Sequence, residues 1–219
     1  MWEKDVKINE IQEIRMKTNV FFGVGAIKKI EDIAQELKKK GIDKVIVISG
    51  KGAYKVTGAW DYVEKALNNN SIGYINYAKV TPNPTTAAID EAVAMAKEFG
   101  AKAVIAIGGG SPIDTGKSVA ILLEYPEKTA AELYEWKFTA EKAAPIVAIN
   151  LTHGTGTEVN RFAVATLLEK NFKPAIAYDC IYPSYSIDDP QLMTKLSKNQ
   201  TLYTSIDAVN HVIAVSYTH

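Results

Sequence analysis

Residues 103–114, with the sequence AVIAIGGGSPID, predict a buried strand, a glycine turn and the start of a helix. The run 103–107 is apolar throughout, which is typical of a strand that helices cover on both faces. Three consecutive glycines let the backbone approach a ligand closely, and Pro112 suits the first turn of a helix. Because a helix N-terminus offers unpaired N–H groups and partial positive charge to an anion, we predict a diphosphate site at residues 108–111. A tight turn without a ligand is the alternative.

Two familiar phosphate motifs do not fit this turn. The P-loop pattern could end at residues 116–118 (GKS), but its first glycine would then fall on Ser111. The dinucleotide pattern GxGxxG fails because Ile113 occupies the position of its last glycine. A P-loop phosphotransferase that uses ATP and Mg²⁺ is therefore disfavoured.

Short apolar runs alternate with helical patterns along most of the chain. The other candidate strands are residues 45–48, 72–77 and 145–149, and the candidate helices are residues 26–40, 60–69, 85–99 and 111–123. This order predicts an α/β fold with a Rossmann-like parallel sheet. From residue 191 onward the pattern is helical. We therefore expect an α/β nucleotide-binding domain at residues 1–182 and the partial start of an all-helical domain at residues 183–219.

The composition excludes several classes of protein. The 219 residues include 25 basic and 25 acidic side chains, so no excess positive charge is available to neutralise nucleic-acid phosphates. No apolar run reaches the length of about 18 residues that suggests a membrane span, and no signal-peptide pattern is present. Cys180 is the only cysteine, and we expect a buried, inert thiol. A cytoplasmic protein is expected.

A second polar turn, THGTGTE at residues 152–158, follows the candidate strand at 145–149. Its threonines offer hydroxyl groups, and its glycines expose the backbone. Ligands of open α/β sheets gather at the carboxyl ends of the strands. The two turns together therefore indicate one nucleotide site more strongly than either turn does alone.

Six motifs in the same order resemble those of the iron-containing (group III) alcohol dehydrogenases. They are FGVGAI at residues 22–27, PNPT at 82–85, GGGSPID at 108–114, GTGTEV at 154–159, DPQL at 189–192 and DAVNH at 207–211. The resemblance implies an NAD(P)-binding α/β domain and an all-helical domain that holds Fe²⁺, with Zn²⁺ as the alternative. In such an enzyme the metal polarises the substrate oxygen, and hydride passes between the substrate carbon and the nicotinamide.

The resemblance also implies which residues bind the cofactor. Gly109, Gly110 and Ser111 would meet the diphosphate, and Asp114 would lie near the nicotinamide. The other implied cofactor contacts are Asn83, Thr152, Thr155, Thr157, Lys173 and Leu192.

The implied metal ligands are Asp207 and His211, which lie four residues apart and so share one helix face. The family's metal site needs two further histidines, and His219 does not fall in a matching motif. We therefore expect an incomplete metal site in a truncated chain.

The chain departs from the family pattern at Gly50, where many members have aspartate. A carboxylate there would accept a hydrogen bond from the ribose 2′-OH and repel a 2′-phosphate. Glycine removes that repulsion and Lys51 adds positive charge, so we predict NADP(H) rather than NAD(H). The alternative is a simple turn with Lys51 in solvent.

These patterns together predict an NADP-dependent, metal-assisted alcohol dehydrogenase that acts on a small alcohol or aldehyde. A related polyol (glycerol-type) dehydrogenase is one alternative, and a nucleotide-binding fragment without catalysis is another. A homodimer is one open arrangement, in which the N-terminal strands of two subunits pair.

Overall fold

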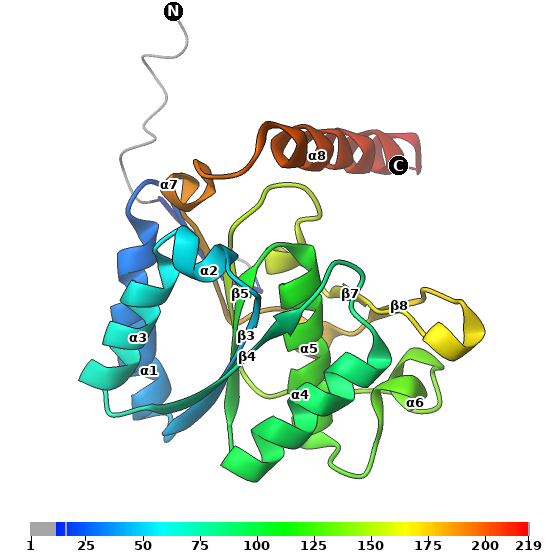
Figure 1. Cartoon of the computed structure of the whole chain (residues 1–219), viewed down its shortest axis with the longest axis horizontal. Coiled ribbons are helices and arrows are strands. Elements are labelled where there is room, and N and C mark those ends of the chain that lie inside the picture. Colours follow the sequence, from blue (N-terminus) through cyan, green and yellow to red (C-terminus); the bar gives the residue numbers. More distant parts are fainter. Residues whose placement is uncertain (1–11, 16, 219) are drawn as a thin grey trace, which may run out of the picture.

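The computed structural model describes residues 12–15 and 17–218. A seven-stranded sheet runs through its centre with the strand order β1-β2-β9-β6-β5-β3-β4 (Figure 1). Its strands are β1 (Gln12–Arg15), β2 (Asn19–Phe22), β3 (Lys44–Gly50), β4 (Gly73–Val80), β5 (Ala103–Gly108), β6 (Ile146–Asn150) and β9 (Tyr185–Asp188). All neighbouring strands are parallel except β1 and β2. The predicted Rossmann-like parallel sheet is therefore confirmed.

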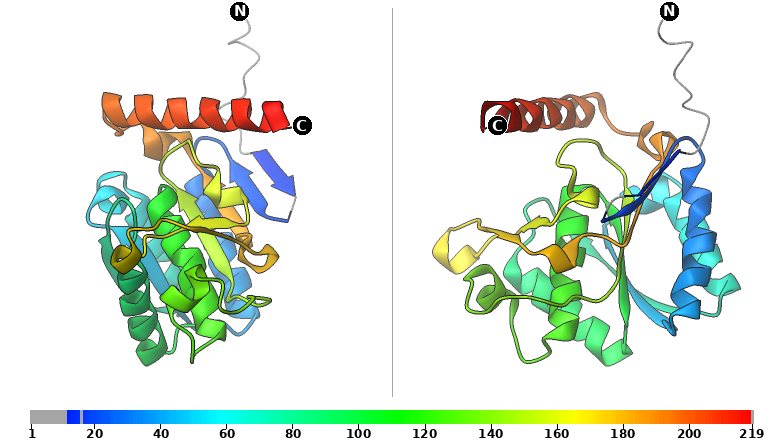
Figure 2. Two further views of the ribbon diagram at one scale, coloured as in Figure 1. Left: turned by 90° about the vertical axis from the view of Figure 1, so that its right-hand side faces the viewer. Right: turned by 180° about the vertical axis from the view of Figure 1, so that it is seen from behind.

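Helices cover both faces of this sheet. They are α1 (Ile30–Lys39), α3 (Ala59–Asn69), α4 (Thr86–Phe99) and α5 (Gly110–Glu124). The first two lie on one face and the last two on the other (Figures 1 and 2). In β3, Val45 and Val47 belong to the core cluster on the α1 and α3 side, while Ile46 and Ile48 belong to the cluster on the other side. Successive side chains of a strand point to opposite faces, so the unbroken apolar runs reflect burial on both sides.

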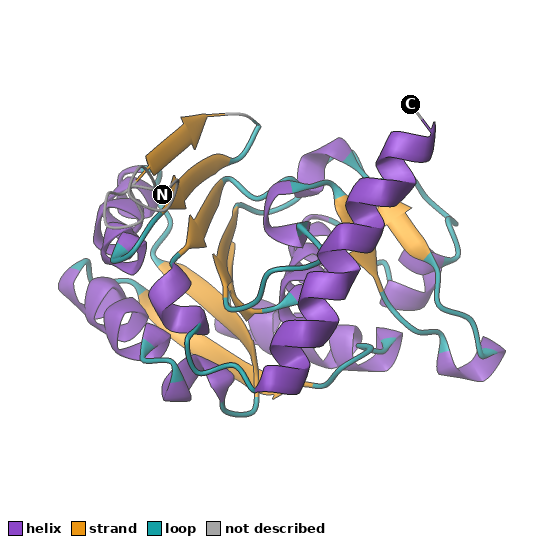
Figure 3. Cartoon of the chain, turned by 90° about the horizontal axis from the view of Figure 1, so that it is seen from above, coloured by secondary structure: helices purple, strands orange, loops and turns teal. Residues whose placement is uncertain are grey.

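Shorter elements and one long helix complete the described chain. They are η2 (Ala26–Lys29), α2 (Ala53–Val56), α6 (Ala130–Tyr134), η3 (Thr157–Val159), β7 (Phe162–Val164), η4 (Leu168–Lys170), β8 (Ala175–Ala177), η5 (Asp179–Ile181), α7 (Pro190–Met193) and α8 (Lys198–Thr218). Helix α8 crosses the end of the molecule at which the parallel strands finish (Figures 1 and 3). Within the described residues, no helix combines the length and hydrophobicity needed to cross a bilayer.

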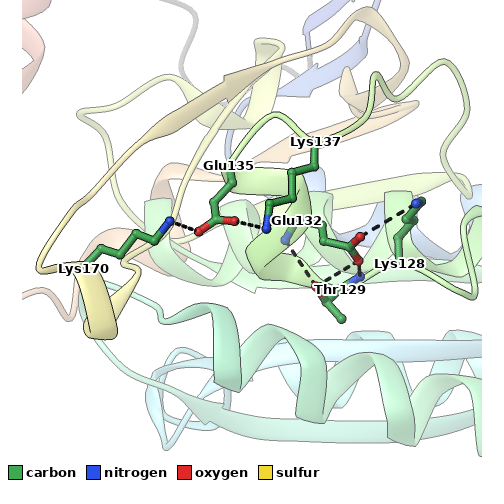
Figure 4. Close-up of polar contacts among 6 residues, drawn as sticks. All are labelled: Lys128, Thr129, Glu132, Glu135, Lys137 and Lys170. Carbon is green, nitrogen blue, oxygen red and sulfur yellow. Dashed lines mark hydrogen bonds and ion pairs between the residues drawn. The ribbon is translucent and has the colours of Figure 1, made fainter.

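Polar contacts fasten α6 to the segment that carries η4. The Thr129 hydroxyl caps α6 by accepting the N–H of Glu132, whose carboxylate accepts the N–H of Thr129 in return. The Glu135 carboxylate lies between Lys137 and Lys170 (Figure 4). These two ammonium groups lower the pKa of Glu135 to about 2. The contacts thus join the segment between β7 and β8 to the body of the fold.

Strand β9 lies between β2 and β6, although its residues follow the boundary that we expected at residue 182. The expectation that residues 183–219 are part of a helical region is therefore wrong for 185–188. The strand is only four residues long, and two of its buried side chains, Ser186 and Asp188, are polar. Hydrophobic periodicity could not reveal such a strand. The sheet extends to Asp188, and the division of the chain into two domains stays a prediction.

The buried side chain of Asp189 connects two of the sequence motifs. One carboxylate oxygen accepts the N–H groups of Gly25 and Ile27, each at 3.1 Å. The other oxygen accepts the N–H of Gln191 at 3.0 Å. Hydrogen bonds to a charged, fully buried acceptor are stronger than neutral ones, and their loss would leave buried donors unpaired. Asp189 therefore holds the turn after β2 against the start of α7.

Replacing Asp189 by alanine is expected to lower the free energy of unfolding by about 3 kcal/mol, because three backbone donors lose a charged acceptor. Urea unfolding followed by circular dichroism measures the change. The control is Asp32→Ala, since the Asp32 side chain is 60% exposed and pairs with Lys29 at the surface. The control should change the stability by less than about 1 kcal/mol. Equal losses in the two variants would contradict the role given to Asp189.

Candidate cofactor site

The glycine turn at residues 108–111 packs directly against the polar turn at residues 152–158, here named the threonine turn. A Cβ built on Gly109 would lie 2.5 Å from Oγ1 of Thr152, and one on Gly110 would lie 3.2 Å from the methyl carbon of Thr155. A side chain at Gly109 would therefore push the threonine turn away. Gly109 is also the N-cap of α5 and supplies no side-chain acceptor. The N–H groups of Gly110 and Ser111 at the start of α5 thus stay available to an anion. Pro112 has no N–H, and the Ile113 N–H donates to the Gly109 carbonyl at 3.3 Å.

A cleft of about 580 Å³, here named the large cleft, opens between these turns. The predicted cofactor residues that line it are Asn83, Gly109, Gly110, Ser111, Asp114, Thr152, Thr155 and Lys173. The Lys173 ammonium donates a hydrogen bond of 2.6 Å to Oδ1 of Asn83, so two distant segments of the chain meet at the cleft. Gln200 and Thr204 of α8 also line it. The cleft lies at the carboxyl ends of the strands, where open α/β sheets bind their ligands.

A second pocket of about 170 Å³, here named the small pocket, shares the lining residues Gly109 and Thr152 with the large cleft. Gly50 lines the small pocket, and its contact with the cofactor stays a prediction. Its wall is otherwise largely apolar, with Leu151 and Leu196 among the lining side chains. Because the two cavities share part of their walls, they can together hold one elongated ligand.

Three of the predicted cofactor residues line neither cavity. Lys51 is exposed next to Gly50. Leu192 is buried in the core cluster beside α1 and α3. Thr157 is buried, and its hydroxyl donates a hydrogen bond to Asp114, which lines the large cleft. The structure thus gives these side chains no direct surface on either cavity, and their roles stay predictions.

The Asp114 carboxylate sits at the floor of the large cleft. It accepts hydrogen bonds from the Thr157 hydroxyl at 2.6 Å and from the Val164 N–H at 3.1 Å. Burial raises the pKa of Asp114 to about 6, and these hydrogen bonds oppose the rise. The two hydrogen bonds thus fix the orientation of the carboxylate, and Asp114 lines the large cleft.

Lys117, one turn along α5 from Asp114, is fully buried beneath the cleft. Its ammonium donates to Oγ1 of Thr157 at 2.8 Å and to the carbonyl oxygens of Asn160 and Phe162 at 2.9 and 2.8 Å. Burial lowers the pKa of Lys117 to about 8. The sequence singled out this lysine only as the end of a failed P-loop. Its position three residues after Asp114, on the same helix face, was the signal that could have revealed the network.

Two further carboxyl groups, those of Asp188 and Glu158, are buried close to the threonine turn. Asp188 accepts hydrogen bonds from Nδ2 of Asn150 at 3.0 Å and from the Ser186 hydroxyl at 2.8 Å, and burial raises its pKa. Burial also raises the pKa of Glu158 to about 7, with a further contribution from the negative charge of Asp188. Glu158 therefore titrates near neutral pH.

Asp207 and His211 lie on α8, with 3.7 Å between Oδ1 and Nε2. A Cβ on Gly154 would lie 3.2 Å from Oδ2 of Asp207, so this carboxylate faces the threonine turn. A carboxylate and an imidazole are suitable donors for Fe²⁺ or Zn²⁺. Across residues 12–15 and 17–218, however, no three His, Cys, Asp or Glu side chains are grouped to hold a metal. Catalytic zinc sites use three protein ligands, so this pair alone does not fit one.

Glu158→Gln is expected to remove a pH-dependent loss of stability. The folded-state pKa of about 7 exceeds the ordinary value of 4.5, so the native state binds more protons than the unfolded state in this window. The free energy of unfolding therefore falls as the pH rises from about 4.5 to about 7, by on the order of 1–3 kcal/mol. Urea unfolding at the two ends of this window measures the loss. The glutamine variant should lack the part that Glu158 contributes, while the raised pKa values of Asp114 and Asp188 act in both proteins.

The matched control for this experiment is Glu98→Gln, because Glu98 is exposed on α4. Its stability relative to the unsubstituted chain should not depend on pH. If the stability of Glu158→Gln relative to the unsubstituted chain is also the same at both pH values, Glu158 is not the titrating group.

Comparison with known proteins supports the resemblance noted in the sequence. The family described as iron-containing alcohol dehydrogenase matches residues 17–190. The long-chain primary alcohol dehydrogenase AdhA of Thermoanaerobacter ethanolicus is 62% identical over 218 residues, which are 100% of this chain and 55% of that protein. The NADH-dependent butanol dehydrogenase B of Clostridium acetobutylicum is 32% identical over 94% of this chain and 52% of its own length.

The fold comparison agrees. The crystal structure of NADH-dependent butanol dehydrogenase A from Thermotoga maritima superposes with a TM-score of 0.85 at 35% identity, over 94% of this chain and 50% of that one. The chain thus spans about half the length of the relatives that it matches. From the family match and the shared fold, we conclude that the chain belongs to the iron-containing alcohol dehydrogenase family.

Proposed function

We propose that this chain is the cofactor-binding part of an NADP-dependent alcohol dehydrogenase that interconverts an alcohol and an aldehyde. The observation that carries the proposal is the large cleft, where the glycine turn, the threonine turn and the N-terminus of α5 meet. The relatives bear the names of alcohol dehydrogenases, which supports the same class of reaction for the whole protein.

The cleft residues suit the binding of a dinucleotide. The N–H groups at the start of α5 and the Ser111 hydroxyl would hold the diphosphate, while the Lys173 ammonium adds positive charge at the cleft. Asp114, fixed by Thr157 and Val164, can accept hydrogen bonds from an amide or hydroxyl of the cofactor. When bound, the nicotinamide supplies or accepts the hydride. The protein residues thus bind and orient the reactive ring.

For the substrate, we favour a small primary alcohol or its aldehyde, and a glycerol-type polyol is the alternative. The names of the relatives range from butanol to long-chain primary alcohols, which supports a primary alcohol without fixing its length. Fe²⁺, with Zn²⁺ as the alternative, is the metal that the family implies. Asp207 and His211 could contribute two of its ligands.

A homodimer and a cytoplasmic location belong to the same proposal. Strand β1 occupies one edge of the sheet, where pairing with a second copy would extend the sheet. Light scattering of the purified protein measures the oligomeric state.

The proposal is tested by titrating the purified chain with NADPH and then adding an aldehyde and Fe²⁺ or Zn²⁺. We expect saturable quenching of protein fluorescence by NADPH, which Gly110→Asp abolishes because the new carboxylate would stand among the diphosphate donors. Consumption of NADPH with an aldehyde supports dehydrogenase activity. Binding without turnover supports a nucleotide-binding fragment without catalysis, and oxidation of glycerol in preference to simple alcohols supports the polyol alternative. Failure to bind either nicotinamide cofactor refutes the proposal.

Gly50→Asp is expected to weaken NADPH binding by about 10- to 100-fold and to leave NADH bound at least as tightly, because a carboxylate repels the 2′-phosphate. A Cβ at Gly50 would lie 3.4 Å from the Val80 carbonyl oxygen, so the side chain fits with little adjustment. The dissociation constants of both cofactors measure the effect. Gly50→Asn is the neutral control of nearly equal size and should retain NADPH binding. Tighter binding of NADH than of NADPH by the unsubstituted chain would overturn the NADP assignment.

A further inference from the structure

The small pocket contains a single charged side chain among the residues that the structure describes, and that side chain is Lys195. No aspartate or glutamate of the described chain lines this pocket. Gly50 lies in the same lining. The electrostatic character of the pocket is thus set by one ammonium group, which favours an anion over a neutral hydroxyl.

Lys195 reaches this position from a distant part of the chain. It follows α7, and its ammonium donates a hydrogen bond of 2.9 Å to the carbonyl oxygen of Val56, the last residue of α2. Carbonyl groups at a helix C-terminus lack intrahelical partners and attract cations. Lys195 is an exposed residue, and this contact places its ammonium beside the pocket.

The ammonium retains donors for a ligand. A lysine ammonium has three N–H groups, of which the Val56 carbonyl takes one. Val56 lines the small pocket together with Lys195, so the remaining donors lie at the wall of that pocket. They can form charge-assisted hydrogen bonds to a phosphate oxygen, which are stronger than bonds between neutral groups.

The lysine that the sequence favours for this role is placed differently. Lys51 and Lys195 are both exposed, but Lys51, which follows Gly50 directly, lines neither the small pocket nor the large cleft. A residue next to Gly50 in the sequence does not have to place its side chain in the small pocket. Lys195, although 145 residues from Gly50, is the cation that shares a cavity with it.

We infer that Lys195 determines cofactor specificity by binding the 2′-phosphate of NADP(H) in the small pocket beside Gly50. The inference rests on the proposed function, because it assigns the charge partner for the cofactor named there. Gly50 leaves room for the phosphate, and Lys195 neutralises part of its charge. NADH presents a 2′-hydroxyl in place of the phosphate and gains little from the ammonium.

The test compares dissociation constants of NADPH and NADH for the unsubstituted chain, Lys195→Met, Lys195→Arg and Lys51→Met. Methionine keeps the length of the side chain and removes its charge. Lys195→Met should weaken NADPH binding about tenfold and change NADH binding by less than about twofold. Lys195→Arg should keep the preference for NADPH, and Lys51→Met should change it little. Unchanged NADH binding also reports that the pocket of each variant is intact.

The outcomes separate this inference from the proposed function. A preference for NADPH that survives Lys195→Met, or that is lost only in Lys51→Met, overturns the role of Lys195 and leaves the proposed function standing. A parallel loss of NADPH and NADH binding in Lys195→Met also overturns it, because the lysine would then support the fold of the pocket alone. Tighter binding of NADH by the unsubstituted chain overturns both the NADP assignment and this inference.

Discussion

The side chain of Thr152 occupies the space that a Cβ on Gly109 would need, and the whole site is built around this contact. Strands β5 and β6 are parallel neighbours, with Gly108 opposite Asn150, so the turns that follow them emerge side by side. The N–H of Leu151 donates to the Gly108 carbonyl at 2.9 Å and continues the pairing into the turns. Close approach of two backbones at this point creates both cavities, since Gly109 and Thr152 line each of them.

A buried polar network lies beneath that contact and keeps the two turns in register. Asp114 and Lys117 belong to α5, whereas Thr157 lies in the last part of the threonine turn, in the segment η3. Lys117 donates to that segment, and Thr157 donates to Asp114. Burial shifts both charged groups toward their neutral forms, so the hydrogen bonds must offset the loss of solvation. The network therefore makes the geometry of the cleft sensitive to single changes of charge.

The edge of the site is completed by segments from the end of the described chain. Asp189 anchors the segment after β9, and this segment then supplies Lys195 and Leu196 to the small pocket. Helix α8 adds Gln200 and Thr204 to the large cleft and carries an exposed apolar face that includes Leu202, Ile206 and Val209. The walls of both cavities thus include residues that come after the parallel sheet is complete.

The sequence by itself determined the class of fold and the core of the site. Unbroken apolar runs predicted buried parallel strands, and the glycines at 108–110 predicted a strand-to-helix turn for an anion, because these signals are local. Only the tertiary structure decided that β9 belongs to the middle of the sheet and that Thr157 is buried. It also decided that Lys195, and not Lys51, shares a pocket with Gly50. The order of the strands in the sheet decides which turns become neighbours, and hydrophobic periodicity along the sequence does not reveal that order.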